Sequence, residues 1–315
     1  MSAPVYRSLA EIPAGLGRTV AAIGNFDGVH VGHREILRAV VREARARGAR
    51  ALAVTFTPHP EQVLMPERAP KLITPGGQRL ELLAETGIDG IVVLGFDAEF
   101  AAMTAREFVE RVLARGLRLC GLHEGANFRF GRNAEAGVGE LAEFGREFGF
   151  QLTMHDAVRV HHGVEVSSSA IRRAISEGRV NHARWMLGSA FRIRGHQMRD
   201  RGVGGKLLVP TVNMAPYEGI VPAPGVYATR VRVAGREFDA VTNVGNRPTF
   251  AGAGFAIESH LLDFAEFEAG EMPQVEVVFL HRIRGERKWP NVEALKAQIG
   301  KDVARARRYF NRVKI

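Results

Sequence analysis

The stretch RTVAAIGNFDGVHVGHREILRAVVREARARGARALAVTF, residues 18–56, predicts a strand, a helix and a second strand. Residues 18–26 form a short apolar run, and residues 33–48 carry their apolar side chains on one helical stripe that ends at Gly48. Another apolar run follows at 51–56. A strand, crossover helix and strand of this length indicate two parallel strands joined by a right-handed connection.

The same alternation continues through the first half of the chain. Helices are expected over 78–87 and 105–116, and strands over 90–96, 117–122 and 150–158. We therefore expect an α/β domain with an open, mostly parallel sheet. Such sheets bind their ligands at the carboxyl ends of the strands.

The second half has a different pattern, which begins after two short helices expected at 170–178 and 180–187. Its strand-like runs are 191–196, 225–234, 236–245, 256–264 and 274–284, and a long helix is expected from residue 291 onward. We predict a closed, antiparallel β-barrel followed by a C-terminal helix. The expected domains are residues 1–187 and 188–315.

The composition is that of an ordinary globular protein. The 315 residues are 46% hydrophobic and 24% charged, and this length suits about two domains. Neither a secretory signal nor an apolar run of about 18 residues is found, so we expect a cytoplasmic protein without a membrane partner. The single Cys120 excludes an internal disulfide and is expected to be a buried thiol in a strand. The net charge of +9 favours polyanionic partners, either nucleic acid or small phosphorylated molecules.

The turn GNFDGVHVGH, residues 24–33, places two histidines at the start of the first long helix. Backbone N–H groups and a helix N-terminus favour an anion at this edge of the sheet. His30 and His33, beside Asp27, could donate hydrogen bonds to phosphate oxygens and stabilise charge on phosphorus. A metal site, which would need a third ligand, and a purely structural turn remain open alternatives.

A second cluster of polar residues lies in VSSSAIRRAISEG, residues 166–178. Serines at a helix start are often only caps. However, Arg172 and Arg173 are expected in the first turn, where a positive charge opposes the helix dipole unless an anion is bound. Hydroxyl groups, backbone N–H groups and a guanidinium together suit a triphosphate.

These two motifs resemble the H-x-G-H and S-S-T-x-I-R signatures of the nucleotidyltransferase fold in its bacterial flavin-making branch. Further similar segments are TFTPHPEQVL (55–64), LITPGGQRLELLAETGID (72–89), FVERVLARGL (108–117) and GANFRFGRNAEAG (125–137), and, for the riboflavin kinase module, VPTVN (209–213), PGVYATRV (224–231), NVGNRPTF (243–250) and IESHLLDF (257–264). Over nearly its whole length, the chain resembles the bifunctional riboflavin kinase/FMN adenylyltransferase family, also called FAD synthetases. The resemblance implies a Rossmann-like nucleotidyltransferase domain followed by an antiparallel, six-stranded riboflavin kinase barrel with a C-terminal helix.

For the first domain, the resemblance implies transfer of AMP from ATP to the phosphate of FMN, which gives FAD and pyrophosphate. His30 and His33 would stabilise the transition state at the α-phosphate. The implied nucleotide and phosphate contacts are Gly24, Phe26, Asn127, Ser168, Ser169 and Arg172. Ser169 stands where the family usually has Thr, and it keeps the hydroxyl group.

For the second domain, the resemblance implies phosphorylation of riboflavin to FMN. Thr211 and Asn213 would coordinate Mg²⁺ that bridges the ATP phosphates, and Glu258 would accept the proton of the attacking hydroxyl. Without the resemblance, the segment PTVN is more typical of a turn at a strand end, and Glu258 of an exposed strand residue. The implied partners are riboflavin, FMN and ATP, and self-association is left open.

The kinase half departs from the family pattern at several positions. Gly205 replaces an Arg, Leu208 replaces a Gly, and a Tyr-Gly pair is missing from 265–274. An FMN adenylyltransferase with a degenerate barrel is therefore an alternative. A second alternative is a nucleic-acid-binding protein, suggested by the basic runs at 44–48 and 301–314. Since both runs fit solvated helix faces, no nucleic-acid partner is expected.

Overall fold

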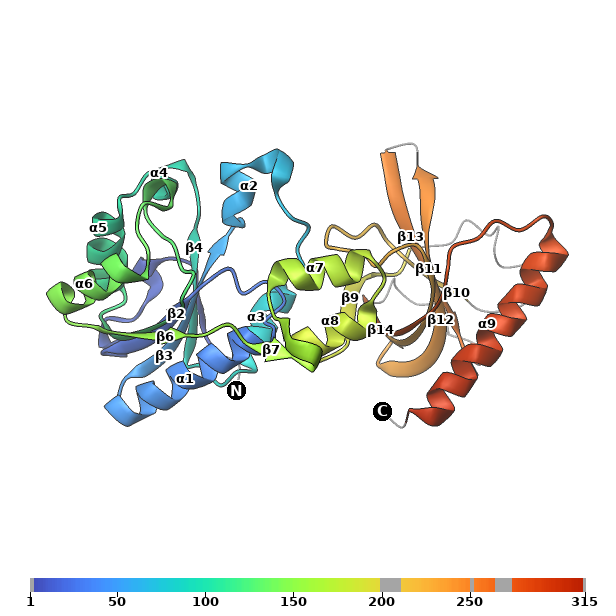
Figure 1. Cartoon of the computed structure of the whole chain (residues 1–315), viewed down its shortest axis with the longest axis horizontal. Helices are drawn as coiled ribbons and strands as arrows, with labels where there is room; N and C mark the ends of the chain where they lie inside the picture. The colour runs from blue at the N-terminus through green and yellow to red at the C-terminus, as the bar shows by residue number, and fades with distance from the viewer. Residues whose placement is uncertain (1–2, 199–210, 250–251, 264–273, 314–315) are drawn as a thin grey trace. The chain divides into compact units, whose positions relative to one another are not determined.

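The computed structural model describes residues 3–198, 211–249, 252–263 and 274–313, and for 246–249 and 252–255 it describes the backbone alone. By its internal contacts the chain divides into two compact units, Met1–Ser168 and Ser169–Ile315 (Figure 1). The predicted boundary between residues 187 and 188 lies two short helices further along. That residues 1–187 carry one activity and residues 188–315 the other is still a prediction.

The first unit is built on a parallel sheet, as residues 18–56 predicted. Its strands, in spatial order, are β1 (Val5–Tyr6), β4 (Gly90–Gly95), β3 (Arg50–Thr57), β2 (Thr19–Ile23), β5 (Leu119–Gly125) and β6 (Gln151–His155). All neighbouring strands in this sheet are parallel. β2 therefore lies at the centre, and the turn that follows it opens at the carboxyl edge of the sheet.

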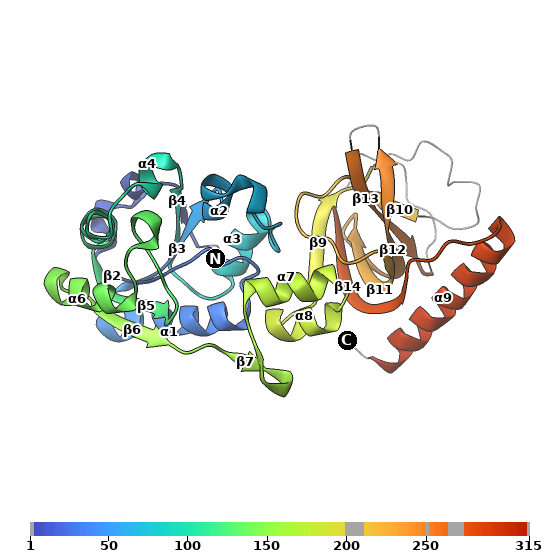
Figure 2. The same ribbon diagram turned by 45° about the horizontal axis from the view of Figure 1, so that its top comes forward.

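Helices cover both faces of this sheet (Figures 1 and 2). α1 (Val31–Arg47) and α3 (Gly77–Ala84) pack on one face through residues such as Leu37, Val40 and Leu83. The other face is covered by α5 (Ala105–Glu107), a π-helical segment (Phe108–Gly116) and α6 (Val138–Phe148). Cys120 is buried in β5, as expected.

The helix α6 was not predicted from the sequence, and neither were several shorter elements of this unit. The shorter elements are β1, α2 (Pro60–Leu64), α4 (Ala98–Ala101), the hairpin of β7 (Arg159–Val160) and β8 (Val164–Glu165), and 3₁₀ turns at Leu9–Glu11, Ala14–Leu16, Pro66–Arg68, Arg132–Ala134 and His161–Gly163. Most contain only two to five residues, too few for a periodic pattern to develop.

The second unit contains the predicted antiparallel sheet. Its helices are α7 (Ser168–Ser176), which begins at the last residue of the first unit, α8 (Val180–Leu187) and α9 (Val292–Arg312). Its strands, in spatial order, are β10 (Thr211–Met214), β13 (Gly252–Leu261), β12 (Arg236–Thr249), β11 (Gly225–Val233), β14 (Gln274–Gly285) and β9 (Phe191–His196). An antiparallel bridge between Gln197 and Met214 joins the two edges and closes the barrel.

The long C-terminal helix α9 packs against the outer face of the barrel (Figure 2). Ala306 of α9 forms an apolar cluster with Val226, Ala228, Val241 and Leu262. Because side chains alternate along a strand, the intervening residues of β11 face the barrel interior. The barrel thus has its own core, and α9 adds a second apolar layer outside it.

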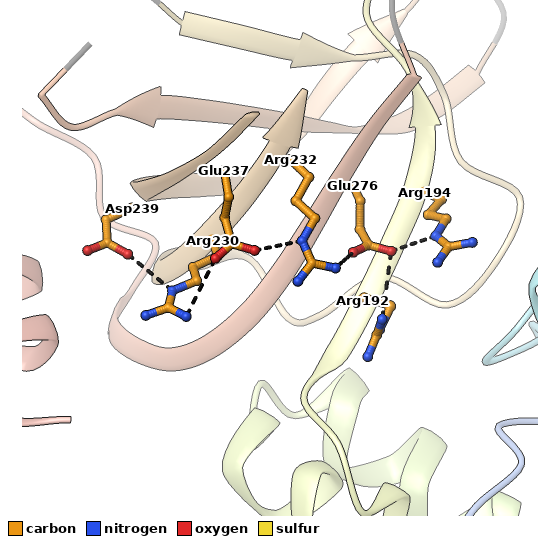
Figure 3. A network of polar contacts seen from close by, with 7 residues as sticks. All are labelled: Arg192, Arg194, Arg230, Arg232, Glu237, Asp239 and Glu276. Carbon is orange, nitrogen blue, oxygen red and sulfur yellow. Dashed lines mark hydrogen bonds and ion pairs between the residues drawn. The ribbon is translucent and has the colours of Figure 1, made fainter. Parts of the chain in front are cut away.

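An ion-pair network lies on the outer face of the barrel (Figure 3). It contains Arg192, Arg194, Arg230, Arg232, Glu237, Asp239 and Glu276. The buried Glu276 carboxylate lies 2.9 Å from Arg232 and 3.9 Å from Arg192, and it also pairs with Arg194. A buried carboxylate needs such partners, and the whole network joins four strands, β9, β11, β12 and β14.

Candidate active site

The two predicted histidines lie together at the start of α1. His30 is the N-cap residue, and its Nδ1 accepts a hydrogen bond of 3.2 Å from the backbone N–H of His33. The two rings stack with centroids 3.5 Å apart. Because Nδ1 of His30 is occupied as an acceptor, its Nε2 carries the proton in the neutral ring and can donate to a ligand.

Both imidazoles are neutral at physiological pH. Burial lowers the pKa of His30 to about 4, against a smaller opposing effect of the Asp27 charge. Burial also lowers the pKa of His33 well below its usual value, and a charge on His30 would lower it further. Nδ1 of His33 is buried and has no hydrogen-bond partner within the described part of the chain. The pair therefore supplies uncharged hydrogen-bonding groups rather than fixed positive charges.

Asp27, which the sequence placed beside the histidines, holds the turn in position. Its carboxylate accepts hydrogen bonds from the backbone N–H groups of residues 73–74, at 2.9–3.0 Å. The buried Arg79 donates to the carbonyl oxygens of Asn25 and Phe56, both at 2.9 Å. These contacts connect the turn to β3 and to the segment before α3. No local pattern in the sequence indicates them, since most of the partners are far away along the chain.

A cavity of about 800 Å³ opens at the carboxyl ends of β2, β5 and β6. Six of the predicted residues line it, namely Gly24, Phe26, His30, His33, Asn127 and Ser168. The hydroxyl of Ser168 donates a 2.9 Å hydrogen bond to the carbonyl oxygen of Asp27. The structure therefore brings most of the predicted nucleotide contacts to one pocket in the first unit. Among the residues described, no group of three His, Cys, Asp or Glu side chains is arranged to hold a metal ion.

The start of α7 differs from the prediction. Arg172 and Arg173 were expected in its first turn, but α7 begins at Ser168, so both lie beyond that turn. The reason is that the serines themselves adopt helical conformation ahead of the apolar pattern. Ser169 and Arg172 belong by their contacts to the second unit. Ser168 and Arg172 are four residues apart and share one face of the helix.

A buried carboxyl group in this pocket was not identified from the sequence. Glu124, the next-to-last residue of β5, lines the cavity, and its Oε1 accepts a 2.8 Å hydrogen bond from the backbone N–H of Ile23. Burial raises the pKa of Glu124 well above its usual value. The only signal was an acidic residue, next to His123, within the largely apolar run LCGLHEG.

In the second unit, the register of the barrel strands brings together the residues expected for the kinase. Asn213 lies directly opposite Glu258, which in turn lies opposite Asn243 on the next strand. Thr211 precedes Asn213 by two residues, so it lies on the same face of the sheet. The alternative interpretation of PTVN as a turn does not hold for its described residues, because Thr211–Met214 is strand β10. The strand is stabilised by hydrogen bonds to β13, and such pairing with a distant segment cannot be predicted from four residues.

The oxygen ligands expected for Mg²⁺ have a suitable environment. Oδ1 of Asn213 is buried and has no hydrogen-bond partner among the described residues, and a hydroxyl group and a carboxylate share its face of the sheet. Hard oxygen donors of this kind are what Mg²⁺ prefers. Gly205, Leu208 and most of the segment that lacks Tyr-Gly lie outside the described residues.

Comparison with known proteins agrees with this two-part arrangement. The family model of FAD synthetase matches residues 13–170, and that of riboflavin kinase matches residues 187–310. A bifunctional riboflavin kinase/FMN adenylyltransferase from Escherichia coli is 36% identical over 94% of this chain and 94% of its own length. This chain belongs to the bifunctional riboflavin kinase/FMN adenylyltransferase family.

Other members and one solved structure extend the comparison. The family member from Haemophilus influenzae is 34% identical over 92% of this chain and 93% of its own. A crystal structure described as a macrolide-efflux protein from Streptococcus pneumoniae is 26% identical, covers 98% of this chain and 99% of its own, and has a TM-score of 0.86. It confirms the fold over both units, while the family assignment rests on the sequence matches. No helix in the described ranges is long and apolar enough to cross a membrane.

The neutral state of the histidine pair can be measured directly. In the ligand-free protein, the ring protons of His30 and His33 should not titrate between pH 8 and pH 5, because protonation of either ring requires charging a buried group. NMR titration, assigned with His30→Gln and His33→Gln variants, would follow both rings. Titration of either ring near pH 6.5 would show that the pair is solvated and would contradict the structure.

Proposed function

We infer that this protein makes FAD from riboflavin in two steps. Riboflavin is phosphorylated by ATP to FMN, and FMN then receives AMP from a second ATP, which releases pyrophosphate. Residues 1–187 are proposed to carry adenylyl transfer, and residues 188–315 riboflavin phosphorylation. The observation that carries this proposal is the match of both family models in this order. The cytoplasm, where ATP is abundant, is the proposed location.

In the proposed adenylyl transfer, an oxygen of the FMN phosphate attacks the α-phosphorus of ATP, and the bond to pyrophosphate breaks. Neutral His30 and His33 donate hydrogen bonds to the oxygens on which negative charge grows. Asn127 and Ser168 line the same cavity and contact the nucleotide phosphates. Gly24 and Phe26, which also line the cavity, lie beside the nucleotide. Ser169 and Arg172, further along α7, bind the departing pyrophosphate. Positioning and charge stabilisation supply the catalysis, without a covalent intermediate.

In the proposed kinase reaction, the ribityl 5′-hydroxyl attacks the γ-phosphorus of ATP. Glu258 accepts the hydroxyl proton, and its place opposite Asn213 supports a role beside the phosphates. Thr211 and Asn213 would hold Mg²⁺, which neutralises phosphate charge when it is bound. The alternative of an adenylyltransferase with a degenerate barrel is disfavoured, because the riboflavin kinase model matches residues 187–310.

The proposal is tested by incubating the protein with riboflavin, MgCl₂ and ATP, and separating the flavins by chromatography over time. FMN should appear first and FAD should follow. If FAD forms only when FMN is supplied, the barrel is inactive and the alternative is correct. If FMN accumulates without FAD, the assignment of the first unit is wrong.

Replacing Arg172 by lysine should weaken adenylyl transfer although the positive charge remains. Lysine lacks the planar guanidinium, which donates two parallel hydrogen bonds to phosphate oxygens, and losing one such bond costs about 1.5–3 kcal/mol. We therefore expect kcat/KM for ATP to fall about tenfold to a hundredfold when FAD formation from FMN is followed. Arg173→Lys is the matched control. Equal kinetics of both variants and the wild type would remove Arg172 from the site.

A further inference from the structure

Three side chains from different elements form a connected polar chain at the wall of the first-unit cavity. Oε2 of Glu43, on α1, lies 2.9 Å from Nε2 of His123, on β5. Nδ1 of His123 lies 2.9 Å from Nε2 of His155, the last residue of β6. His123 is buried, and both histidines line the cavity. The proposed mechanism above uses none of the three residues.

The arrangement fixes where the protons lie in the neutral rings. A lone pair on Nε2 of His123 would face the Glu43 carboxylate at 2.9 Å, so this nitrogen carries the proton. Burial lowers the pKa of His123, which keeps the ring neutral and leaves a lone pair on Nδ1. Nε2 of His155 must then be the donor in the contact between the rings. This assignment rests on the two 2.9 Å contacts and on the negative charge of Glu43.

His155 is therefore left with an acceptor nitrogen. In the neutral ring of His155, Nε2 carries the proton and Nδ1 carries a lone pair. A phosphate oxygen is also an acceptor, so it would be repelled there. The ligand atom that His155 suits is a hydrogen-bond donor, such as an amino group.

The position of His155 indicates which part of the nucleotide it meets. β5 lies between β2 and β6 in the sheet, so the end of β6 is about 10 Å from the end of β2, where the His30–His33 turn begins. With the α-phosphate at that turn, the ribose spans part of this distance and the base reaches the end of β6. On an adenine base, the donor is the exocyclic 6-amino group.

We propose that His155 selects adenine in the adenylyl-transfer site by accepting a hydrogen bond from its 6-amino group, and that Glu43 and His123 are positioning residues that hold the required tautomer. The inference rests on the proposed placement of ATP in this cavity. Arg47, 2.9 Å from the second carboxylate oxygen of Glu43, balances the charge at the far end. Guanine and hypoxanthine carry a carbonyl oxygen at position 6, which would oppose the lone pair of His155.

The first test uses the unmodified protein with FMN and three nucleotides at pH 8. These are ATP, purine riboside triphosphate, which has hydrogen at position 6, and inosine triphosphate, which has oxygen there. We expect kcat/KM for dinucleotide formation to fall about tenfold when the donor is lost, and further when the oxygen opposes the lone pair. Equal use of ATP and inosine triphosphate would overturn the proposal. Failure of the protein to make FAD from FMN and ATP would instead overturn the proposed function.

The second test examines the polar chain by changing its remote end. In a Glu43→Gln variant, the new amide can present either its oxygen or its nitrogen to His123, so both tautomers of the chain become available. The preference for ATP over inosine triphosphate should therefore fall about tenfold, although residue 43 does not line the cavity. His155→Phe, which keeps an aromatic ring but has no acceptor, should reduce the preference similarly. The control is Glu143→Gln, an exposed glutamate on α6.

Riboflavin phosphorylation by the same variants reports on the second unit only, so folding of the first unit, which contains residues 43 and 155, is checked by far-UV circular dichroism. An unchanged ATP preference in both Glu43→Gln and His155→Phe would overturn the proposal. So would an effect of His155→Phe confined to KM for FMN, because it would place the flavin at His155. If His155→Phe instead abolished discrimination between ATP and 2′-deoxy-ATP, the contact would be to the ribose, and the proposal would also be wrong.

Discussion

Replacing His33 by alanine is expected to abolish conversion of FMN to FAD while riboflavin is still phosphorylated to FMN. His33 stacks on His30 at the cavity wall and can donate to the α-phosphate as charge develops. One such donor contributes on the order of 3 kcal/mol, so the rate should fall at least about a hundredfold. Separate assays with FMN plus ATP and with riboflavin plus ATP measure the two activities.

The kinase activity of the same protein serves as the internal control. Folding of the first unit is checked by far-UV circular dichroism, because Trp185 and Trp289, the two tryptophans of the chain, both belong to the second unit. Equal loss of both activities in a folded His33→Ala protein would contradict the assignment of two separate sites.

Replacing Glu258 by glutamine is expected to have the opposite pattern. Glutamine has nearly the same shape but cannot accept the proton of the ribityl hydroxyl. Riboflavin phosphorylation should therefore slow by a factor on the order of 10²–10⁴, the usual contribution of a general base. Conversion of added FMN to FAD should stay at the wild-type rate. Turnover of riboflavin at saturating ATP is the measurement.

Glu293→Gln, at an exposed position in the first turn of α9, is the matched control for this substitution. If Glu258→Gln phosphorylates riboflavin as fast as the wild type, another group accepts the proton. A loss that is recovered by raising ATP would instead indicate a role in nucleotide binding.

The sequence predicted the long, periodic elements well and the irregular ones poorly. The helix α6 was missed because Gly139 and Gly145 lower its helix propensity. The structure explains Gly145, since a Cβ there would lie 2.7 Å from the carbonyl oxygen of Phe150. Close packing of the helix against the following chain thus required a residue that weakens the local helix signal.

The candidate site was predictable where its residues form local motifs. His30, His33 and Ser168 were found from two short segments, and the structure brings all three to one cavity. Arg79 was missed because its contacts are non-local. Glu124 was also missed, since a single acidic residue in a strand does not show whether it is buried. The barrel register that pairs Asn213 with Glu258 likewise depends on strand pairing.

Complementation between the two inactive variants tests the central claim, that two separate sites make FAD from riboflavin, most directly. His33→Ala should stop at FMN, and Glu258→Gln should make little FMN but use added FMN. Mixing the two proteins with riboflavin, MgCl₂ and ATP should therefore restore FAD formation, which chromatography would detect. If each variant loses both activities and the mixture makes no FAD, the two steps do not occur at separate sites, and the account is wrong.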